Sequence, residues 1–552
     1  MHDTSQEGFY FLPLGGADDI GMNIYAYGAN DKWIVVDAGY GFLGDDYKGM
    51  DMCYISPDFL EKRKENIEGL FITHGHEDHM GAIAHVWDAL RCKVYATPFV
   101  AELMKERLEE FGLADQAEIE EVAEGSTVQT ETFKVEYISL AHSVPESCGL
   151  FIQTPHGNIF HATDWRFDDG RLDMIKTDYE ALKKIAQKKV TLFVCDSTNI
   201  FVDHQEPSEF QIRQNLLKLV PTIKGGLVAT CFASNLMRLE SFILAADLAG
   251  RTPILLGKTL HTNIKLAQKC GYFKDLPMAH LPEAVESITS DKALYICTGS
   301  QANYHSALAM IANGENKHVK LGKGDTVLFS SKIIPGNEEK IKRMQEKFID
   351  DGVSVVTEEE QKIHTTGHCS KDELKKMYDI IKPEIVFPVH GDRSFIREHR
   401  AFAYSCGISH ICSGKNGDLF FVSGERITHV DKVPIDVMGV DHKRSVSLHS
   451  EVVKNRVRIA YHCSLFASVV LSKENQVVDL QISSKNILEQ ADWQILIEKI
   501  KPELVEHLNL ILQENGLNRH AEELMKSAVR KAVYHQTDVK PVTVMHIYQE
   551  HD

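Results

Sequence analysis

The chain lacks two features that would mark an extracellular or membrane protein. None of its eleven cysteines forms a Cys-X-X-Cys pair, and their odd number and scattered positions favour reduced thiols over a disulfide framework or a cysteine-based zinc site. No apolar run reaches membrane-spanning length, and the N-terminus MHDTSQEGFYFLPLGG has no basic stretch followed by an apolar core. We therefore expect a soluble cytoplasmic protein that does not enter a membrane.

Positive charge is also scarce. The 552 residues include 60 Lys and Arg against 79 Asp and Glu, which gives a formal net charge of −19. Because Lys and Arg usually supply most of the non-specific affinity for nucleic acid, this balance argues against a broad nucleic-acid-binding surface. A hydrophobic content of 43% excludes a disordered or fibrous chain, and the length predicts about three domains.

Short runs rich in Val, Ile and Phe alternate with amphipathic segments over roughly the first 430 residues, a pattern that predicts α/β layers. The predicted strands are Trp33–Val36, Gly69–Thr73, Lys134–Leu140, Thr191–Cys195, Leu227–Phe232, Pro253–Leu256, Ala293–Cys297, Thr326–Phe329, Val353–Thr357 and Glu384–Val389. The clearest predicted helices are Ile83–Leu90, Ala101–Phe111 and Glu339–Phe348.

The C-terminal part of the chain has a different pattern. Mixed polar sequence near Asp436–Ser450 predicts a linker, which we extend to residue 455. Beyond it we expect a small α+β domain. Its predicted elements are the strands Arg456–Leu471 and Gln476–Ile482, helices near Asp492–Glu514 and Asn518–Tyr534, and a last strand Pro541–Tyr548. Lys526, Arg530 and Lys531 lie at near-helical spacing, and we interpret them as a solvated helix face.

The densest group of chemically active residues is in FITHGHEDHMG, between a predicted buried strand and a helix. It contains His74, His76, Asp78 and His79 within six residues. Imidazoles with a carboxylate suit zinc, and manganese is the alternative. Four ligand-capable groups on so short a loop exceed what one ion can easily take, so we expect two ions to share the loop.

Further ligands should come from other strand ends, because sites assemble at the carboxyl edge of a sheet. His142 follows the strand Lys134–Leu140, Asp164 follows Asn158–His161, and His390 follows Glu384–Val389. Each residue alone would more often be a structural polar group. Their shared position at strand ends favours ligation.

The long interval between Asp164 and His390 has its own alternation of strands and helices, which predicts an inserted domain rather than a loop. The whole set of motifs resembles the metallo-β-lactamase-fold hydrolases of the β-CASP group and, within that group, the ribonuclease J family. The motifs are LPLGGADDIGMN, IVVDAGYGF, FITHGHEDHMGAI, HSVPES, HATDW, CDSTNI, CFASNLMRL, CTGSQ, SSKIIPGNE, HTTGHCS, KPEIVFPVHGDRSFIREH and RKAVYHQTDVKPV.

The resemblance implies an α/β fold made of a metallo-β-lactamase αββα sandwich, an inserted β-CASP α/β domain and a small C-terminal α+β domain. The expected boundaries are 1–203 and 361–435 for the sandwich, 204–360 for the insertion, 436–455 for the linker and 456–552 for the C-terminal domain. In the family the inserted domain closes over the metal site and forms a channel that takes a single strand.

The resemblance also assigns the ligands of two divalent ions, with zinc expected and manganese as the alternative. One ion would be held by His74, His76, His142 and Asp164, and the other by Asp78, His79, Asp164 and His390, with Asp164 bridging. Asp37 matches an aspartate that orients the loop by hydrogen bonds. Two ions about 3.5–4 Å apart would supply a nucleophile at neutral pH and offset the charge that develops on a phosphodiester.

By the same resemblance His368 would protonate the leaving 3′ oxygen, Asp196 would orient it, and Asp78 would act in catalysis through its ion. A pocket for a nucleotide phosphate would be formed by Ser234, Ser331, His364 and Thr366. Phe232 could stack on a base or simply pack in the core, and both readings stay open. Two segments depart from the family pattern: Ala302-Asn303-Tyr304 replaces a Gly-Glu-Pro run, and Asp18-Asp19 replaces Gly-Glu.

We expect a ribonuclease that acts in RNA maturation and decay on single-stranded RNA, as a 5′-to-3′ exonuclease preferring 5′-monophosphate ends with some endonuclease activity. A homodimer or homotetramer and partners in an RNA-decay complex are also expected. The alternatives are a hydrolase of a lactone, thioester or β-lactam, and a non-catalytic scaffold subunit. DNA is a closer competitor as substrate, but in the group a histidine at the position of His390 favours RNA.

Overall fold

The computed structural model describes residues 7–44, 46–47, 49–168, 170–285, 288–334 and 336–549. The first six residues of the N-terminal stretch considered above lie outside these ranges. The chain divides into two compact units. The first consists of Met1–Gly41 and Tyr54–Asp436, and the second of Phe42–Cys53 and Val437–Asp552.

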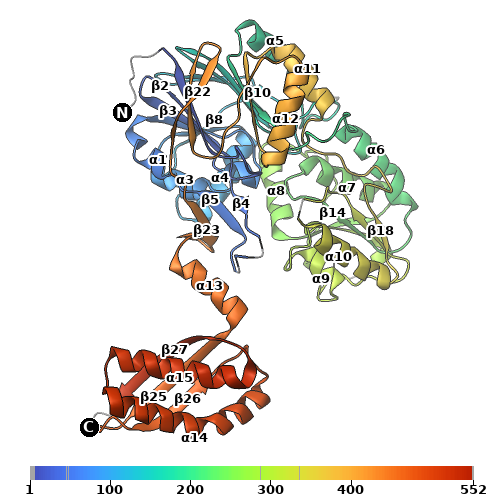
Figure 1. Ribbon diagram of the computed structural model, residues 1–552. Helices are drawn as coiled ribbons and strands as arrows, with labels where there is room; N and C mark the ends of the chain where they lie inside the picture. The colour runs from blue at the N-terminus through green and yellow to red at the C-terminus, as the bar shows by residue number, and fades with distance from the viewer. Residues whose placement is uncertain are drawn as a thin grey trace. The chain divides into compact units, whose positions relative to one another are not determined.

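Two facing sheets form the centre of the first unit (Figure 1). The eight-stranded sheet has the order β22-β21-β1-β2-β3-β6-β7-β8, and the seven-stranded sheet has the order β20-β19-β13-β12-β11-β10-β9. The strands of the first sheet are β1 Phe9–Gly15, β2 Ile24–Ala29, β3 Lys32–Val36, β6 Ile67–Phe71, β7 Val94–Ala96, β8 Ile119–Glu121, β21 Asp418–Ser423 and β22 Arg426–Lys432. Those of the second are β9 Thr127–Gln129, β10 Lys134–Ser139, β11 Cys148–Thr154, β12 Gly157–Ala162, β13 Leu192–Asp196, β19 Ile385–Val389 and β20 His410–Ile411.

Apolar side chains from both sheets meet in one core. Phe11 and Val36 of the eight-stranded sheet pack with Leu150, Val194 and Phe387 of the seven-stranded sheet, and all five are fully buried. Strands buried on both faces need helices outside them. The covering helices are α5 Tyr179–Gln187, α11 Lys371–Ile381 and α12 Arg393–Ser405 on the seven-stranded sheet, and α3 Ile83–Leu90 and α4 Pro98–Glu110 beside the eight-stranded sheet. The expected αββα sandwich is confirmed.

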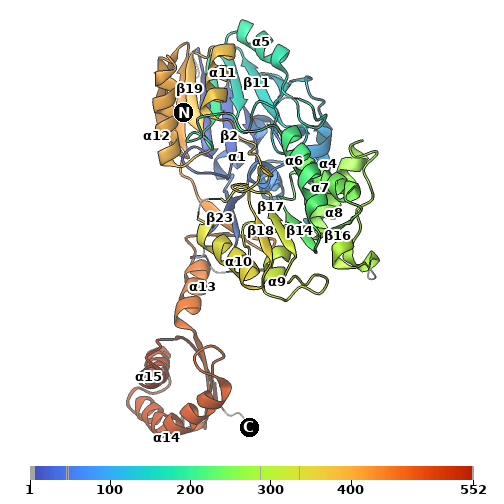
Figure 2. The same ribbon diagram turned by 90° about the vertical axis from the view of Figure 1, so that its right-hand side faces the viewer.

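An inserted domain with a five-stranded parallel sheet lies between β13 and β19 in the chain. Its strands, in the order β15-β16-β14-β17-β18, are β15 Thr252–Leu256, β16 Ala293–Cys297, β14 Leu227–Thr230, β17 Thr326–Phe329 and β18 Ser354–Val356. Figure 2 shows α6, α7 and α8 grouped beside this sheet, apart from α9 and α10. The helices are α6 Glu209–Leu219, α7 Leu236–Leu248, α8 Lys258–Lys269, α9 Ala307–Ala312 and α10 Glu338–Asp350.

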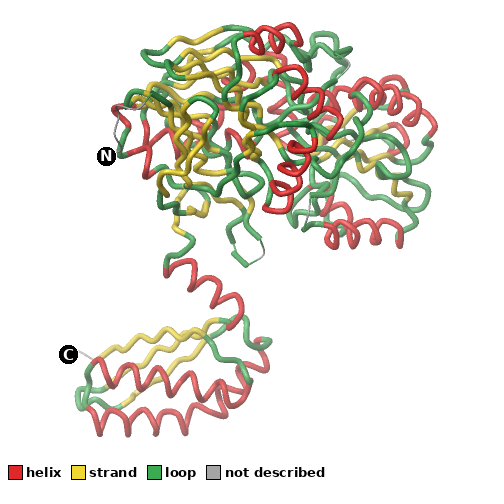
Figure 3. The backbone as a smooth tube through the Cα atoms, turned by 45° about the horizontal axis from the view of Figure 1, so that its top comes forward, coloured by secondary structure: helices red, strands yellow, loops and turns green. Residues whose placement is uncertain are grey.

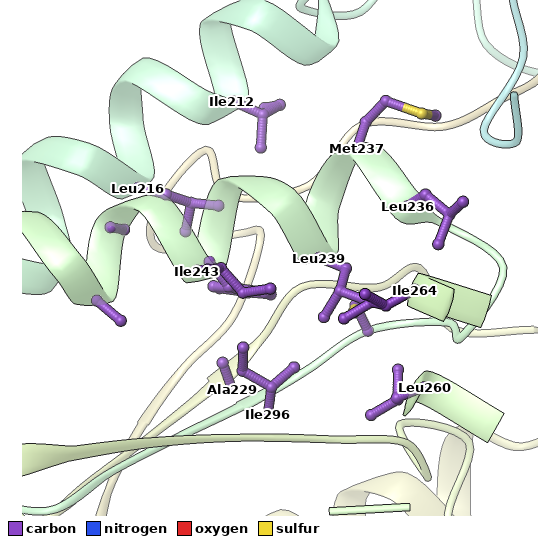
Figure 4. Close-up of a cluster of buried hydrophobic side chains, with 14 of the residues drawn as sticks. Ile212, Leu216, Ala229, Leu236, Met237, Leu239, Ile243, Leu260, Ile264 and Ile296 are labelled. Carbon is purple, nitrogen blue, oxygen red and sulfur yellow. The ribbon is translucent and has the colours of Figure 1, made fainter. Parts of the chain in front are cut away.

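The core of the inserted domain is visible in Figure 4. Ile212 of α6 and Ile243 of α7 lie over Ala229 and Ile296 of the sheet, with Leu260 of α8 beside them. A second apolar cluster on the opposite face joins the sheet to α9 and α10. Each face of the parallel sheet is therefore covered, as strands that are apolar on both faces require.

The predicted elements of the first unit agree closely with the observed ones. The strands Ala293–Cys297 and Thr326–Phe329 and the helix Ile83–Leu90 match residue for residue. The strand predicted to reach Phe232 ends instead at Thr230, because α7 begins soon after it with Asn235 as its N-cap. Phe232 and Ser234 therefore lie in a loop at the carboxyl end of β14.

The second unit differs from the prediction at its start. The predicted linker contains a hairpin of β23 Val437–Asp441 and β24 Arg444–Ser447. The prediction of a strand from Arg456 is wrong over its first half, because α13 Glu451–His462 occupies it and β25 begins only at Ser464. The Ser450 side chain accepts a hydrogen bond from the Val453 N–H and starts this helix, whose only buried side chain is Val453. Val457, Ile459 and Tyr461 stand at every second position, a spacing typical of a strand, which accounts for the wrong prediction.

The rest of the second unit is the expected small α+β domain. Its three-stranded sheet has the order β26-β25-β27, and its two long helices pack on one face of that sheet, as Figure 3 shows in red and yellow. The elements are β25 Ser464–Leu471, β26 Val477–Ser483, α14 Gln490–Asn515, α15 Arg519–Thr537 and β27 Val542–Gln549. Among the described residues, no helix is both long and apolar enough to cross a membrane.

Candidate metal centre

The predicted ligands come from the ends of four strands of the sandwich. Four of them stand on the loop after β6 and on the short helix α2 Glu77–Met80, while His142, Asp164 and His390 follow β10, β12 and β19. The structure brings all seven together in two groups whose candidate ligand atoms lie within 4.8 Å of one another. The groups are His74, His76, His142 and Asp164, and Asp78, His79, Asp164 and His390.

The loop docks closely on the chain after β3. Backbone N–H groups of Ala38 and Tyr40 donate to the carbonyls of His79 and Glu77, at 2.6 and 2.8 Å. A Cβ on Gly39 would lie 1.7 Å from the Asp78 carbonyl oxygen, so only glycine permits this approach. The backbone contacts therefore set the position of the ligand loop.

In the first group the nitrogen atoms converge. His76 Nδ1 lies 3.1 Å from His74 Nε2 and 3.0 Å from His142 Nε2. Asp164 Oδ2 lies 3.7 Å from His74 Nε2 and 3.5 Å from His142 Nε2. Zinc bonds of about 2.0–2.2 Å place tetrahedral ligand atoms about 3.3–3.6 Å apart. The observed spacings bracket that range.

The second group uses the other oxygen of the same carboxylate. Asp164 Oδ1 lies 3.1 Å from His79 Nε2 and 3.3 Å from His390 Nε2. Asp78 Oδ2 lies 3.6 Å from His79 Nε2 and 3.1 Å from His390 Nε2. Asp164 thus faces both groups, one oxygen to each.

Hydrogen bonds outside the groups determine which imidazole nitrogen faces inward. His79 Nδ1 donates to Asp37 Oδ2 at 2.7 Å, and His142 Nδ1 donates to the Gly367 carbonyl at 2.6 Å. Thr198 Oγ1 donates to the His390 carbonyl and therefore accepts from His390 Nδ1, 2.8 Å away. Because Nδ1 carries the proton in each of these contacts, Nε2 is the nitrogen that each ring directs into the site.

Asp37 organises the first group as well. It accepts hydrogen bonds from the Thr73 N–H at 2.8 Å and from the Thr73 hydroxyl at 2.9 Å. Because that hydroxyl donates to Asp37, it accepts from His74 Nδ1, which lies 3.0 Å away. The orienting role expected for Asp37 is thus visible as direct contacts.

This donor set fits a metal site. Lone pairs and carboxylate oxygens aimed at one another repel unless a cation lies among them. Asp164 Oδ1 is buried and has no hydrogen-bond partner among the described residues. Neutral imidazoles with carboxylates are a donor set that zinc prefers. The residues therefore hold the chemistry and the spacing that a divalent ion needs.

The two groups differ in their electrostatics. Burial lowers the pKa of His74 and His142 well below the usual value and that of His76 to about 4, so these rings are neutral. Burial also opposes charge on His79 and His390, yet the Asp164 and Asp78 carboxylates raise the pKa of His79 well above its usual value and that of His390 to about 9. The second group is thus held together by opposite charges.

The backbone is strained at two of these positions. Asp37 and His390 have φ values of 64° and 56°, in the left-handed region that favours glycine. Such strain is kept where the surrounding structure over-determines it, typically at functional sites. A third constraint is at Gly367, where a Cβ would lie 2.6 Å from the His142 ring.

The predicted proton donor lies beside the metal groups. His368 Nδ1 is 2.8 Å from Asp196 Oδ2 and 3.9 Å from Asp164 Oδ2. Its ring centroid lies 5.1 Å from that of His142 and 5.6 Å from that of His390. Burial disfavours its charged form, but the Asp196 and Asp164 carboxylates raise the pKa of His368 overall. The side chain stays 20% exposed, so it can reach a bound molecule.

The predicted phosphate-pocket residues lie on three segments of the inserted domain and its border. Thr366 Oγ1 accepts from Asn199 Nδ2 at 3.0 Å and from the His368 N–H at 3.2 Å, which joins it to the proton donor. His364 and Ser331 are buried, and Ser234 lies just before the N-cap of α7. Phe232 is half-buried. A single phosphate pocket formed by these four polar side chains stays a prediction.

Sequence reasoning missed three cationic residues near these segments. Arg238 of α7 forms a two-point ion pair with Glu209 and lies 3.2 Å from His364 Nδ1. Arg166 donates to the Thr366 carbonyl at 2.7 Å, and Lys332 Nζ lies 3.3 Å from Asn199 Oδ1. Burial and then the charges of Arg238, Lys332 and Arg166 hold the pKa of His364 well below its usual value.

Two of the missed cations were within motifs already noted, Arg238 in CFASNLMRL and Lys332 in SSKIIPGNE. Arg166 directly follows HATDW, and no motif or spacing in the sequence singles it out. Asn23 was also missed, although it ends LPLGGADDIGMN. Its side-chain amide donates to the Asp78 carbonyl and lies 3.1 Å from His79 Nε2.

The segments that depart from the family pattern take part in local contacts. Asn416 donates to Asp18 through its backbone N–H and to Asp19 through its side chain, at 3.2 and 2.9 Å. In the second segment Tyr304 is exposed, and the preceding Gln301 donates to the Lys332 carbonyl at 2.9 Å. The altered loop is thus tied to the segment that carries Ser331.

Three family models match the chain, in order along it. They are the β-lactamase superfamily domain over residues 32–203, the "Ribonuclease J, beta-CASP domain" over 224–348, and the "Zn-dependent metallo-hydrolase RNA specificity domain" over 352–405. The first match lies in the sandwich and the second in the inserted domain. The third begins just before β18, the last strand of the inserted sheet, and continues through β19 and α12 of the sandwich.

Curated relatives match over most of the chain. Ribonuclease J of Sinorhizobium meliloti is 33% identical over 82% of this chain and 83% of its own length. Ribonuclease J of a Synechocystis strain is 29% identical over 94% of this chain and 81% of its own, and ribonuclease J 1 of Streptococcus pyogenes is 29% identical over 96% of each. A crystal structure of a protein of unknown function from Enterococcus faecalis matches with a TM-score of 0.52 at 14% identity, over 75% of this chain and all of that one, which shows the fold alone.

Proposed function

The chain belongs to the ribonuclease J family and is a metal-dependent ribonuclease, and from that premise we propose that it uses two divalent ions to degrade single-stranded RNA from 5′-monophosphorylated ends, with some endonuclease activity. The observation that carries the proposal is Asp164, whose two oxygens face two separate ligand groups. A carboxylate in that position is what a shared two-ion site requires.

One ion would be held by His74, His76, His142 and Asp164, and the other by Asp78, His79, Asp164 and His390. We expect zinc, with manganese as the alternative, because the donors are nitrogen and oxygen. When bound, two such ions lower the pKa of a water molecule and offset charge on phosphate oxygens.

His368 and Asp196 carry the proton step of the proposal. Asp196 is fully buried and fixes the His368 ring through a 2.8 Å hydrogen bond to Nδ1. The other ring nitrogen is then available to give a proton to the leaving 3′ oxygen of the RNA. The Asp196 carboxylate orients the ring and raises the pKa of His368, so the ring is protonated when the 3′ oxygen leaves.

Recognition of a 5′ monophosphate rests on the four polar side chains Ser234, Ser331, His364 and Thr366. Burial lowers the pKa of His364, and the positive charges of Arg238, Lys332 and Arg166 lower it further. The same positive charges would attract a phosphate to this region. Ser234 also lies at the N-terminal end of α7, where backbone N–H groups favour an anion. Phe232, half-buried in the adjacent loop, would stack on the terminal base.

The test compares RNA of one sequence with a 5′ monophosphate, triphosphate or hydroxyl, labelled at either end, with each metal assayed in parallel. We expect the monophosphate to be degraded fastest, nucleotide by nucleotide, and the Asp78→Ala/His79→Ala double variant to be inactive. DNA of the same sequence and a chromogenic lactam serve as comparison substrates. Equal rates on all three ends would contradict the pocket, and RNA decay by the double variant would contradict the two-ion assignment.

Assembly and location complete the proposal. A homodimer or homotetramer assisted by the C-terminal domain is expected, and light scattering on the purified chain measures it. Partners in an RNA-decay complex and a cytoplasmic location also stay predictions. The scaffold alternative is disfavoured because all seven candidate ligands are present and grouped.

A further inference from the structure

The end of β13 and the loop that follows it, Asp196–Asn199, contact both the proposed proton donor and one metal ligand. Asp196 holds His368, and Thr198 contacts both the ring nitrogen and the carbonyl of His390. Asn199 donates to the His368 carbonyl at 3.1 Å. Within the loop, the Thr198 N–H donates to Asp196 Oδ1 at 2.8 Å. A shift of this loop would therefore move the proton donor and a metal ligand together.

The Ser197 side chain hydrogen-bonds to a covering helix and not to the site. Its Oγ lies 2.8 Å from Nδ1 of His399 on α12, and Nε2 of the same ring lies 2.6 Å from the hydroxyl of Tyr378 on α11. The exposed fractions of Ser197, His399 and Tyr378 are 1%, 0% and 3%. Two covering helices are thus tied to the loop through one buried imidazole.

The contacts of this ring are specific. Burial lowers the pKa of His399 to about 3, so the ring is neutral and has one donor and one acceptor nitrogen. Both nitrogens are used, one by each hydroxyl. A buried polar group left without its partner destabilises the fold, so the ring resists any movement of Ser197. Space is also limited, since a Cβ on Gly391 would lie 3.2 Å from Ser197 Cβ.

We propose that His399 is a positioning residue for RNA hydrolysis, because it anchors Ser197 and thereby fixes where Asp196 holds His368 and Thr198 holds His390. The inference rests on the proposed function for its activity readout. It assigns a role to a side chain that lies behind the site and contacts neither ion nor RNA.

Two single-hydroxyl deletions test the idea with matched chemistry. Ser197→Ala removes the partner of His399 Nδ1 on the side of the site, and Tyr378→Phe removes the partner of Nε2 on the far side. Each leaves one nitrogen of the same buried ring unpaired, so both should lower Tm to a similar extent. Ser197→Ala should also lower kcat about 10- to 100-fold with KM unchanged within about threefold, while Tyr378→Phe should change kcat less than about threefold.

A second pair of variants separates the two contacts within the ring itself. The amide of His399→Asn lies about where Nδ1 does and that of His399→Gln about where Nε2 does, so only the Asn variant can reach Ser197. We expect kcat of the Asn variant to exceed that of the Gln variant by about tenfold. Zinc loss to an excess of chelator, which needs no RNA, should be faster in Ser197→Ala and His399→Gln than in the other two variants.

The outcomes are distinguishable. If all four variants lose stability but keep kcat and the rate of zinc loss, His399 is only a structural residue and the inference is wrong. If the unmodified protein fails to hydrolyse RNA, the proposed function fails. The zinc-loss comparison still decides whether His399 positions the metal ligand His390. Equal losses of kcat in Ser197→Ala and Tyr378→Phe would also overturn the inference.

Discussion

The two ligand groups share Asp164 and are both buried, but they differ in charge because only the second contains another carboxylate, that of Asp78. The first adds three imidazoles to Asp164, all neutral because of burial. The second adds Asp78, whose carboxylate helps to raise the pKa of His390 to about 9. Residues of one loop, His76 and Asp78, therefore enter two different electrostatic environments. Burial prepares the first group for a cation, whereas the second must first release protons.

The largest expected effect comes from removing what the groups share. Asp164→Asn takes away the negative charge that both groups face, so we expect both ions to be lost and kcat/KM to fall by at least about 10⁴-fold. Metal analysis of the purified protein and RNA hydrolysis measure it. Asp173→Asn is a control, because the Asp173 carboxylate is exposed. If the variant kept two ions per chain, Asp164 would not be a shared ligand.

The next largest effect is expected from substitutions that remove a ligand from one group and leave the other group intact. His142→Ala removes a ligand from the first group only, and His390→Ala from the second only. We expect each variant to retain one tightly bound ion and to lose about 10²- to 10³-fold in kcat, because the remaining ion still polarises the phosphate. Metal content after dialysis is the measurement. Loss of both ions from both variants would mean that the groups bind as one unit.

A smaller effect is expected from removing the hydrogen bonds by which Asp37 orients ligands of both groups. Asp37→Asn keeps the shape of the side chain but removes its charge and one of the two oxygens that accept hydrogen bonds from His79 Nδ1 and Thr73. Loss of such an outer contact typically costs 10- to 100-fold in metal affinity. Chelator competition should show the second group affected more, since Asp37 contacts His79 directly and His74 only through Thr73. An equal loss at both groups would contradict this ranking.

The smallest effect is a difference in pH dependence. In the metal-free protein the pKa of His76 is about 4 and that of His390 about 9. At neutral pH the first group is already deprotonated, so its metal affinity should not change between about pH 6 and 8. The second group must lose protons to bind, so its affinity should rise by about tenfold per pH unit for each proton released until the pH reaches the pKa.

Calorimetry in buffers of different ionisation enthalpy measures this proton release directly. His390→Ala and His142→Ala, each with one group intact, allow the two groups to be titrated separately. We expect release from the second group near pH 7 and close to none from the first. Equal release from both would show that the charge difference between them does not govern metal binding.

Much of the site could be recognised from sequence because its residues stand at strand ends. Strand periodicity located β6, β10, β12 and β19, and ligand-type residues follow each of them. The helix α13 was mistaken for a strand, because its apolar residues Val457, Ile459 and Tyr461 stand at every second position. The cations near His364 were missed for another reason. Their contacts join segments far apart in the chain, as Arg166 with Thr366 does.

The sequence by itself determined the alternation of strands and helices and the presence of ligand-type residues at strand ends, since both depend on local periodicity and on side-chain chemistry. Its motifs also carried the resemblance that implies the order of the layers and the two sets of ligands. Only the tertiary structure decided that one oxygen of Asp164 faces each group, that Asp37 supports His79 directly, and that Ser197 is held from behind by His399. These relations depend on how strands and helices pack, and no local pattern encodes them. The same packing decided the charge of each group, because burial and neighbouring carboxylates shift a histidine pKa in opposite directions.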